Sequence, residues 1–122
     1  MNAKPHSIDS IETLTGEIRA FRDARDWLQF HNPKELAVAI AAEAGELLQH
    51  FVWQNAEQSE RRAVERKEAI GSETADVAIL LFELADNLGI DLAGAMRSKM
   101  AQNELRYPVE KARGSNKKYN EL

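Results

Sequence analysis

The stretch NPKELAVAIAAEAGELLQHFVW, residues 32–53, decides the fold. Asn32 can accept a hydrogen bond from a free backbone amide, Pro33 is tolerated at the first helical position, and Glu35 favours the positive end of a helix. Apolar residues then recur at steps of three and four. The stretch therefore predicts an amphipathic helix from Pro33 to about Trp53.

Three more helices are expected around it. The first runs from about Ile8 to Trp27, with Asp9 or Ser7 as its cap and with Ile8, Ile11, Leu14, Ile18 and Phe21 at helical spacing. Another ends near Asn87-Leu88-Gly89, where glycine can adopt the left-handed conformation. The last runs from Leu92 to about Arg106, capped by Asp91 and stopped by Pro108, with Leu92, Ala95, Met96 and Met100 on its buried side.

Two segments lack apolar residues at regular helical spacing. Residues 54–67 are polar and charged, and this connection is expected to become helical partway along. Residues 107–122 are expected to form an extended basic tail that becomes ordered only against something else. The sequence thus predicts an all-α fold, a four-helix bundle, in one domain over residues 1–122.

Composition limits the class of protein. The 122 residues include 43% hydrophobic residues, three prolines and six glycines, which suits a helical globular domain. There is no cysteine, so any metal must be held by oxygen or imidazole. We find no apolar run of signal-peptide or membrane-span length, and we expect a cytoplasmic protein with no membrane contact.

Charge is divided unevenly along the chain. The net charge is −4, yet residues 97–122 contain seven Lys or Arg and three Asp or Glu. An acidic body with a basic C-terminal segment argues against nucleic-acid binding and suits a site where metal and phosphate meet, although ordinary solvated charge would give the same pattern.

Two acidic pairs interrupt apolar helix faces. Glu43 and Glu46 stand three residues apart, and so do Glu73 and Asp76. Glu43 is in line with Leu36, Ile40 and Leu47, and the second pair with Ile70, Leu80 and Leu84. Four carboxylates converging on a half-buried face would repel one another unless a cation joined them.

Mg²⁺ suits such a site, because it prefers oxygen ligands and keeps positions open for substrate phosphates. The simpler alternative is that both pairs lie on solvated faces. A di-iron bundle fits less well, because it uses Glu-x-x-His pairs and His50 follows Glu46 at four residues rather than three.

Aromatic and basic residues flank the acidic pairs. Trp53 lies seven residues after Glu46, about 10 Å along a helix and on nearly the same face. Trp27, Phe30 and His31 could form the other wall of a base pocket, with Gln29 or His31 at the base edge, or they could simply close the core. Lys99, Asn103 and Arg106 form a polar stripe that could neutralise a triphosphate, as could the later Arg113, Lys118 and Tyr119.

These motifs together resemble the MazG-like all-α nucleotide pyrophosphohydrolases, in their dCTP pyrophosphatase branch. The resemblance rests on the acidic spacing and on the blocks RDWLQFH (25–31), AEAGEL (42–47), FVWQ (51–54), SKM (98–100), NELRYPV (103–109), RGS (113–115) and KY (118–119).

The resemblance implies a helical protomer that assembles as a homotetramer or homodimer, with sites built partly from neighbouring subunits. It also implies Glu43, Glu46, Glu73 and Asp76 as catalytic Mg²⁺ ligands for a dCTP-like nucleoside triphosphate. The base and sugar pocket would include Trp27, Leu28, Gln29, Phe30, His31 and Trp53.

Two positions depart from dCTP-specific relatives. Leu80 of the pocket replaces a tyrosine and Ile18 replaces a histidine, which affects base or sugar discrimination rather than chemistry. Ser72 replaces an acid and affects the number of metal ions. The alternatives are a related pyrophosphohydrolase with another base preference, a catalytically silent nucleotide-binding module, and a structural helical dimer.

Overall fold

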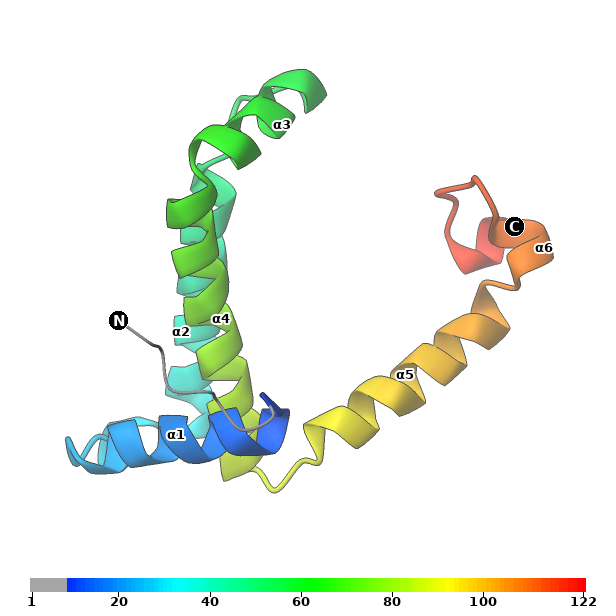
Figure 1. Cartoon of the computed structure of the whole chain (residues 1–122). Coiled ribbons are helices and arrows are strands. Elements are labelled where there is room, and N and C mark those ends of the chain that lie inside the picture. Colours follow the sequence, from blue (N-terminus) through cyan, green and yellow to red (C-terminus); the bar gives the residue numbers. More distant parts are fainter. Residues whose placement is uncertain (1–8) are drawn as a thin grey trace. The chain divides into compact units, whose positions relative to one another are not determined.

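The computed structural model describes residues 9–122, and in this range it contains only helices and turns (Figure 1). The α-helices are α1 (Ile11–Asp23), α2 (Pro33–Gln49), α3 (Ala56–Glu65), α4 (Lys67–Asn87), α5 (Leu92–Arg106) and α6 (Val109–Ala112). Two short 3-10 helices, η1 (Leu28–Phe30) and η2 (Tyr119–Glu121), complete the chain. The all-α class is confirmed. The described helices include none that is both long enough and apolar enough to cross a membrane.

The chain divides into two compact units. The first ends at Gly89, and the second comprises Ile90–Leu122. The four long helices expected from the sequence are present, but α5 belongs to the second unit.

Side-chain caps fix the helix starts. Asn32 accepts from the amide of Glu35 at 2.9 Å and starts α2, as predicted. Asp91 accepts from the amide of Gly94 at 3.1 Å and starts α5. The cap of α1 is Ser10, which accepts from the amide of Thr13, so the prediction of Asp9 is wrong. Ser7 and Ile8, also named for this start, lie outside the described residues.

Two helices end earlier than predicted. α1 stops at Asp23 rather than at Trp27, and α2 stops at Gln49 rather than at Trp53. Asp26 and Trp53 have φ values of 54° and 63°, in the left-handed region that a right-handed helix cannot pass through. Both tryptophans therefore lie in turns.

The connection 54–67 contains a full helix, α3, whose start is a capping box between Asn55 and Gln58. The extended tail predicted for 107–122 is wrong, since α6 and η2 shorten it. Within the second unit the ring of Tyr107 packs edge-on against that of Tyr119, with centroids 6.1 Å apart. These local contacts order the tail.

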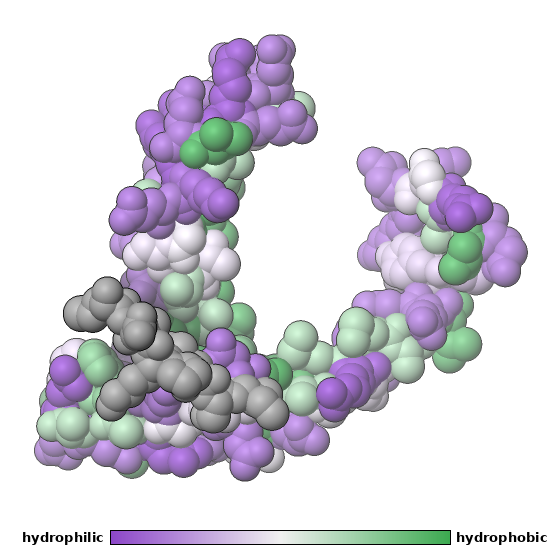
Figure 2. Space-filling view, in the orientation of Figure 1, coloured by the Kyte–Doolittle hydropathy of each residue, from purple (hydrophilic) through white to green (hydrophobic). Residues whose placement is uncertain are grey.

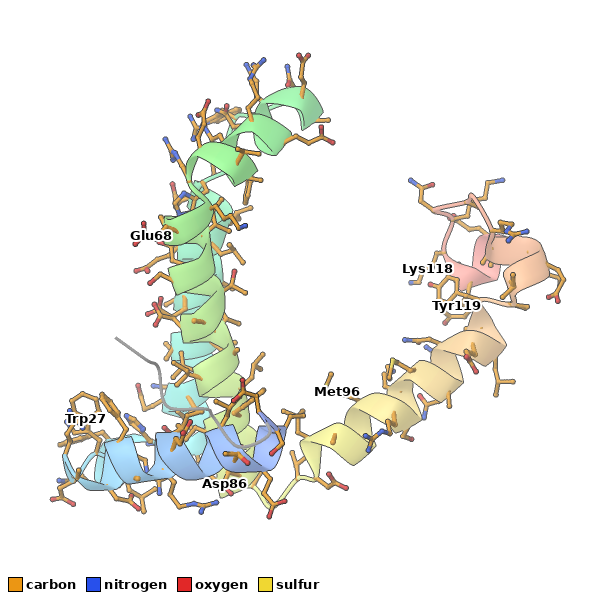
Figure 3. The ribbon with its side chains drawn as sticks, viewed as in Figure 1. Trp27, Glu68, Asp86, Met96, Lys118 and Tyr119 are labelled. Atoms are coloured by element: carbon orange, nitrogen blue, oxygen red, sulfur yellow. The ribbon has the colours of Figure 1, made fainter. Side chains whose placement is uncertain are left out.

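The buried side predicted for α5 is also wrong. α5 contains no buried residue, and Met96 and Met100 are 51% and 58% exposed. Figure 3 shows Met96 projecting from the helix.

The first unit is built on the pair α2 and α4, which lie side by side with α1 across one end (Figure 1). His31, before α2, contacts Glu83 near the end of α4, and His50, after α2, contacts Glu73 near its start. The two helices are therefore antiparallel. Leu36, 2% exposed, lies in the core of this unit, whereas hydrophilic side chains cover α3 (Figure 2).

Candidate functional site

The four predicted carboxylates come together where α2 and α4 face each other. A hydrogen bond with Glu46, burial, and the negative charges of Glu46, Asp76 and Glu73 raise the pKa of Glu43. Glu43 Oε2 is buried without a hydrogen-bond partner. The cluster therefore holds uncompensated negative charge, which is the condition that a cation would relieve.

The donor set fits a hard divalent cation, since all four groups are carboxylates on two adjoining helices. In the conformation described for residues 9–122, no three His, Asp or Glu side chains are arranged closely enough to hold a metal ion. Glu43 hydrogen-bonds to Glu46, and Glu73 pairs with His50. Metal binding would therefore require side-chain rotation of Glu43 and Glu73, with the backbone left in place.

His50 is the neighbour that sequence reasoning did not assign to the site. Its Nε2 lies 2.5 Å from Glu73 Oε2, and its Nδ1 is buried without a partner. Arg62 of α3 donates to the His50 carbonyl at 3.0 Å and so holds the end of α2. The spacing of His50 four residues after Glu46 was the available signal, because it places both side chains on one helix face.

The predicted base-pocket residues 27–31 form a corner between α1 and α2. The Trp27 ring packs edge-on against Phe21, with centroids 5.9 Å apart, and lies 6.2 Å from the His31 ring. Trp27, Leu28 and Phe30 are 42%, 51% and 61% exposed. Gln29 donates to Asp26 Oδ2 at 2.9 Å, so its amide stabilises the turn. The corner therefore presents apolar rings beside one imidazole, with Trp27 labelled in Figure 3.

Trp53 is not part of that corner. It is 95% exposed and follows His50, which contacts Glu73, whereas His31 contacts Glu83. Ten residues of α4 separate these two contact points, or about 15 Å. Trp53 and His31 therefore lie toward opposite ends of the helix pair, and they do not form facing walls within one chain. Leu80 lies between Asp76 and Glu83 on one face of α4, at steps of four and three residues.

The basic residues predicted to bind phosphate all belong to the second unit. They are Lys99, Asn103, Arg106, Arg113 and Lys118, together with Tyr119. The Arg106 guanidinium lies 4.8 Å from the centre of the Tyr119 ring, and the Lys118 amine lies 5.9 Å from it. These three residues form one cationic group within that unit, of which Figure 3 labels Lys118 and Tyr119.

A buried charged pair was missed by sequence reasoning. Arg22 and Glu83 are 5% and 4% exposed, and Glu83 binds His31. Glu83 comes seven residues after Asp76, so an acid in line with the predicted ligands was the available signal.

Comparisons with known proteins show the family of this chain. Residues 38–122 match the MazG-like family. dCTP pyrophosphatase 1 of Rattus norvegicus is 40% identical over 118 residues, covering 95% of this chain and 68% of the relative. The same protein of Homo sapiens is 38% identical over the same shares.

A solved structure shares the fold as well. The crystal structure of a pyrophosphatase from Archaeoglobus fulgidus matches with a TM-score of 0.79 and 38% identity, over 87% of this chain and 99% of that one. The resemblance predicted from the acidic pairs and the aromatic and Arg-Tyr-Pro blocks is thereby confirmed. This chain belongs to the MazG-like family.

Proposed function

We propose that this chain is a nucleoside triphosphate pyrophosphohydrolase that converts dCTP, or a modified dCTP, into the monophosphate and pyrophosphate. The observation that carries the proposal is the carboxylate cluster of Glu43, Glu46, Glu73 and Asp76, whose negative charge raises the pKa of Glu43. Family membership and the two dCTP pyrophosphatase relatives supply the substrate class.

Glu43, Glu46, Glu73 and Asp76 would hold Mg²⁺. The bound ion would offset negative charge that develops on the phosphates during hydrolysis. The chain's own contribution is to keep four carboxylates on two helices that pack side by side, so that the backbone carrying the ligands is in place before substrate arrives.

The proposed pocket uses the aromatic corner at 27–31 for the base and sugar. The cationic group of the second unit is proposed to bind phosphate, in the same chain or in another copy. Trp53, toward the opposite end of the helix pair and 95% exposed, would join the pocket of another copy. This placement supports the proposal that the active form is a homo-oligomer, a dimer or a tetramer.

The test is pyrophosphate release from a panel of canonical and 5-modified nucleoside triphosphates, with and without Mg²⁺. We expect Mg²⁺-dependent hydrolysis that favours dCTP or its analogues. A different preferred base would identify a related pyrophosphohydrolase, and binding without hydrolysis would identify a silent nucleotide-binding module.

Two variants test the ligand assignment directly. Glu46→Gln and Asp76→Asn should each lower kcat by roughly two to three orders of magnitude while circular dichroism remains helical. Glu68→Gln is the matched control, because Glu68 is an exposed acid in the first turn of α4 (Figure 3). Full hydrolysis in both ligand variants would refute the assignment.

A further inference from the structure

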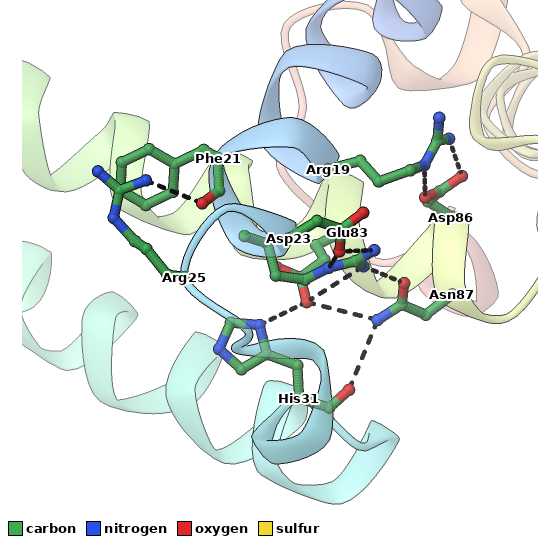
Figure 4. A network of polar contacts seen from close by, with 9 residues as sticks. Arg19, Phe21, Asp23, Arg25, His31, Glu83, Asp86 and Asn87 are labelled. Carbon is green, nitrogen blue, oxygen red and sulfur yellow. Dashed lines mark hydrogen bonds and ion pairs between the residues drawn. The ribbon is translucent and has the colours of Figure 1, made fainter.

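A polar cluster with two buried charged residues joins the end of α1 to the end of α4 beside the aromatic corner (Figure 4). It consists of Arg22, Asp23, His31, Glu83 and Asn87, and we call it the Arg22 cluster. Arg22 and Glu83 are 5% and 4% exposed. Buried charges lose hydration, so a buried ion pair is weak evidence for a gain in stability. We therefore look for a function of the cluster beyond stability.

Its contacts converge on one imidazole. Glu83 Oε2 lies 2.7 Å from His31 Nδ1 and 4.0 Å from Arg22 Nη1. Asn87 accepts from Arg22 Nη1 at 2.8 Å, and its amide lies 3.5 Å from the His31 carbonyl. The His31 side chain and backbone are thus both held from α4 (Figure 4).

These contacts select one tautomer of His31. An ionised carboxylate can only accept hydrogen bonds, so in the neutral imidazole of His31 the hydrogen is on Nδ1, which donates it to Glu83. Nε2 then keeps its lone pair. Within residues 9–122 the only ring nitrogen of His31 with a hydrogen-bond partner is Nδ1, and the His31 side chain is 24% exposed. His31 therefore offers one fixed, accessible acceptor beside the Trp27 ring.

The acceptor lies at a suitable distance from the carboxylates. Glu83 follows Asp76 by seven residues, which is about 10 Å along α4 and nearly the same face. That is about the distance from a nucleotide's phosphates to its base. A base resting on Trp27, 42% exposed and 6.2 Å from the His31 ring, would bring its polar edge to Nε2.

We propose that Glu83, anchored by Arg22 and Asn87, is a positioning residue that fixes His31 as a hydrogen-bond acceptor for the amino group of an aminopyrimidine base. The inference rests on the proposed function and adds to it a physical basis for selecting cytosine over uracil and thymine. Cytosine presents a donor at this edge, whereas uracil and thymine present an oxygen that Nε2 would repel.

The kinetic test compares dCTP with dUTP in the full-length protein. Glu83→Gln should raise the KM for dCTP by roughly tenfold and leave kcat within about threefold, because a Gln amide can face Nδ1 with its oxygen or its NH2 group and no longer fixes one tautomer of His31. The dUTP constants should change little, so the preference for dCTP falls. Asp86→Asn is the matched control, since Asp86 lies on the same helix and pairs with Arg19 outside the cluster. An unchanged preference in Glu83→Gln would overturn the proposal.

A second measurement does not depend on hydrolysis or on the variant. Long-range ¹H–¹⁵N NMR of the wild-type protein should show His31 protonated at Nδ1, and dCMP but not dUMP should shift the Nε2 resonance. His31 protonated at Nε2, or equal shifts with both nucleotides, would overturn the proposal. A selective shift with dCMP in a protein that hydrolyses no triphosphate would retain the positioning role and reject the proposed hydrolase.

Discussion

Trp53 combines an exposed side chain with a left-handed backbone, a combination that costs stability. Its φ is 63° and its side chain is 95% exposed, so no core contact in the chain offsets the strain. For an L-residue this conformation costs roughly 1–2 kcal/mol, and glycine largely avoids the cost. Strain at an exposed aromatic residue is consistent with a binding role.

We therefore expect Trp53→Gly to be more stable than Trp53→Ala by about 0.5–1 kcal/mol, since only the alanine retains a Cβ in the left-handed region. Urea unfolding of the two variants measures the difference. Both should raise the KM for dCTP, because both remove the ring. Equal stability of the two variants would show that the turn is not strained.

Glu43 predicts a pH dependence for the metal-free protein. Because Glu46, burial and the neighbouring acids raise the pKa of Glu43, the folded state binds more protons than the unfolded state over the interval between the two pKa values. Stability contributed by this group is therefore present below its ordinary value of 4.5 and is lost as pH rises through the raised value.

Glu43→Gln should accordingly raise the midpoint of thermal unfolding at pH 7 and change it little at pH 4, when measured in a chelator. Excess Mg²⁺ should stabilise the wild-type protein and have a much smaller effect on the variant. A variant that is less stable than wild type at pH 7 without metal would contradict the repulsion inferred at Glu43.

At the scale of elements, α3 depends on its capping box. Asn55 accepts from the amide of Gln58 at 2.8 Å, and Gln58 accepts from the amide of Asn55 at 2.9 Å. Asn55→Ala should destabilise the protein by about 1 kcal/mol. Amide hydrogen exchange should become faster within α3, whereas the exposed control Glu60→Ala should leave exchange nearly unchanged. If Asn55→Ala speeds amide exchange equally inside and outside α3, the capping box does not act locally on this helix.

The ion pair between α1 and α4 responds to acid. Arg19 donates to both oxygens of Asp86, at 2.8 and 3.0 Å, and this hydrogen bonding lowers the pKa of Asp86. The stability from the pair is present above the ordinary Asp value of 3.8 and is lost as pH falls through the lowered value. Because Arg19 is 49% exposed, Asp86→Asn should cost only about 0.5 kcal/mol at pH 7.

Chemical denaturation at pH 7 and at pH 2 checks this sign. The difference between wild type and Asp86→Asn should be smaller at the lower pH, because Asp86 gains protons as pH falls through its lowered pKa. An equal stability difference at both pH values would show that the effect of Asp86→Asn does not come from loss of the ionised carboxylate.

How much the sequence predicts depends on how local each signal is. Asn32 and Asp91 were identified as caps because a cap involves neighbouring residues. The helix ends at Asp23 and Gln49 were missed, since the left-handed residues that follow them, Asp26 and Trp53, are not the glycine that usually marks such a break.

For the site, too, local signals could be predicted from the sequence and long-range contacts could not. The spacing of the acidic pairs predicted a carboxylate cluster, because helix geometry alone puts each pair on one face. The contacts His50–Glu73 and Arg22–Glu83 join residues that are 23 and 61 positions apart. Only the packing of α1, α2 and α4 brings them together.

At the scale of the whole molecule, much apolar surface of the described residues is exposed to solvent. Among the described residues only Leu36 and Ala85 are buried apolar residues, while a chain of this length usually buries about two-thirds of its surface on folding. An apolar groove of about 500 Å³ runs between α1 and α4. Its lining includes Leu14, Ile18, Phe21, Ile79 and Phe82. Exposure of this extent favours association.

We expect light scattering to give a mass that is a multiple of the 13.7 kDa protomer. Ile79→Glu places a charge in the groove, where Ile79 is 44% exposed, and should shift the mass toward one protomer with the helix content kept. Val64→Glu is the control, because Val64 is 79% exposed on α3 and lies outside the groove.

Since Trp53 and His31 lie toward opposite ends of one helix pair, a pocket that needs both requires two copies. Dissociation should therefore raise the KM for dCTP together with the fall in mass, and a dissociated variant with an unchanged KM would place the whole pocket within a single chain.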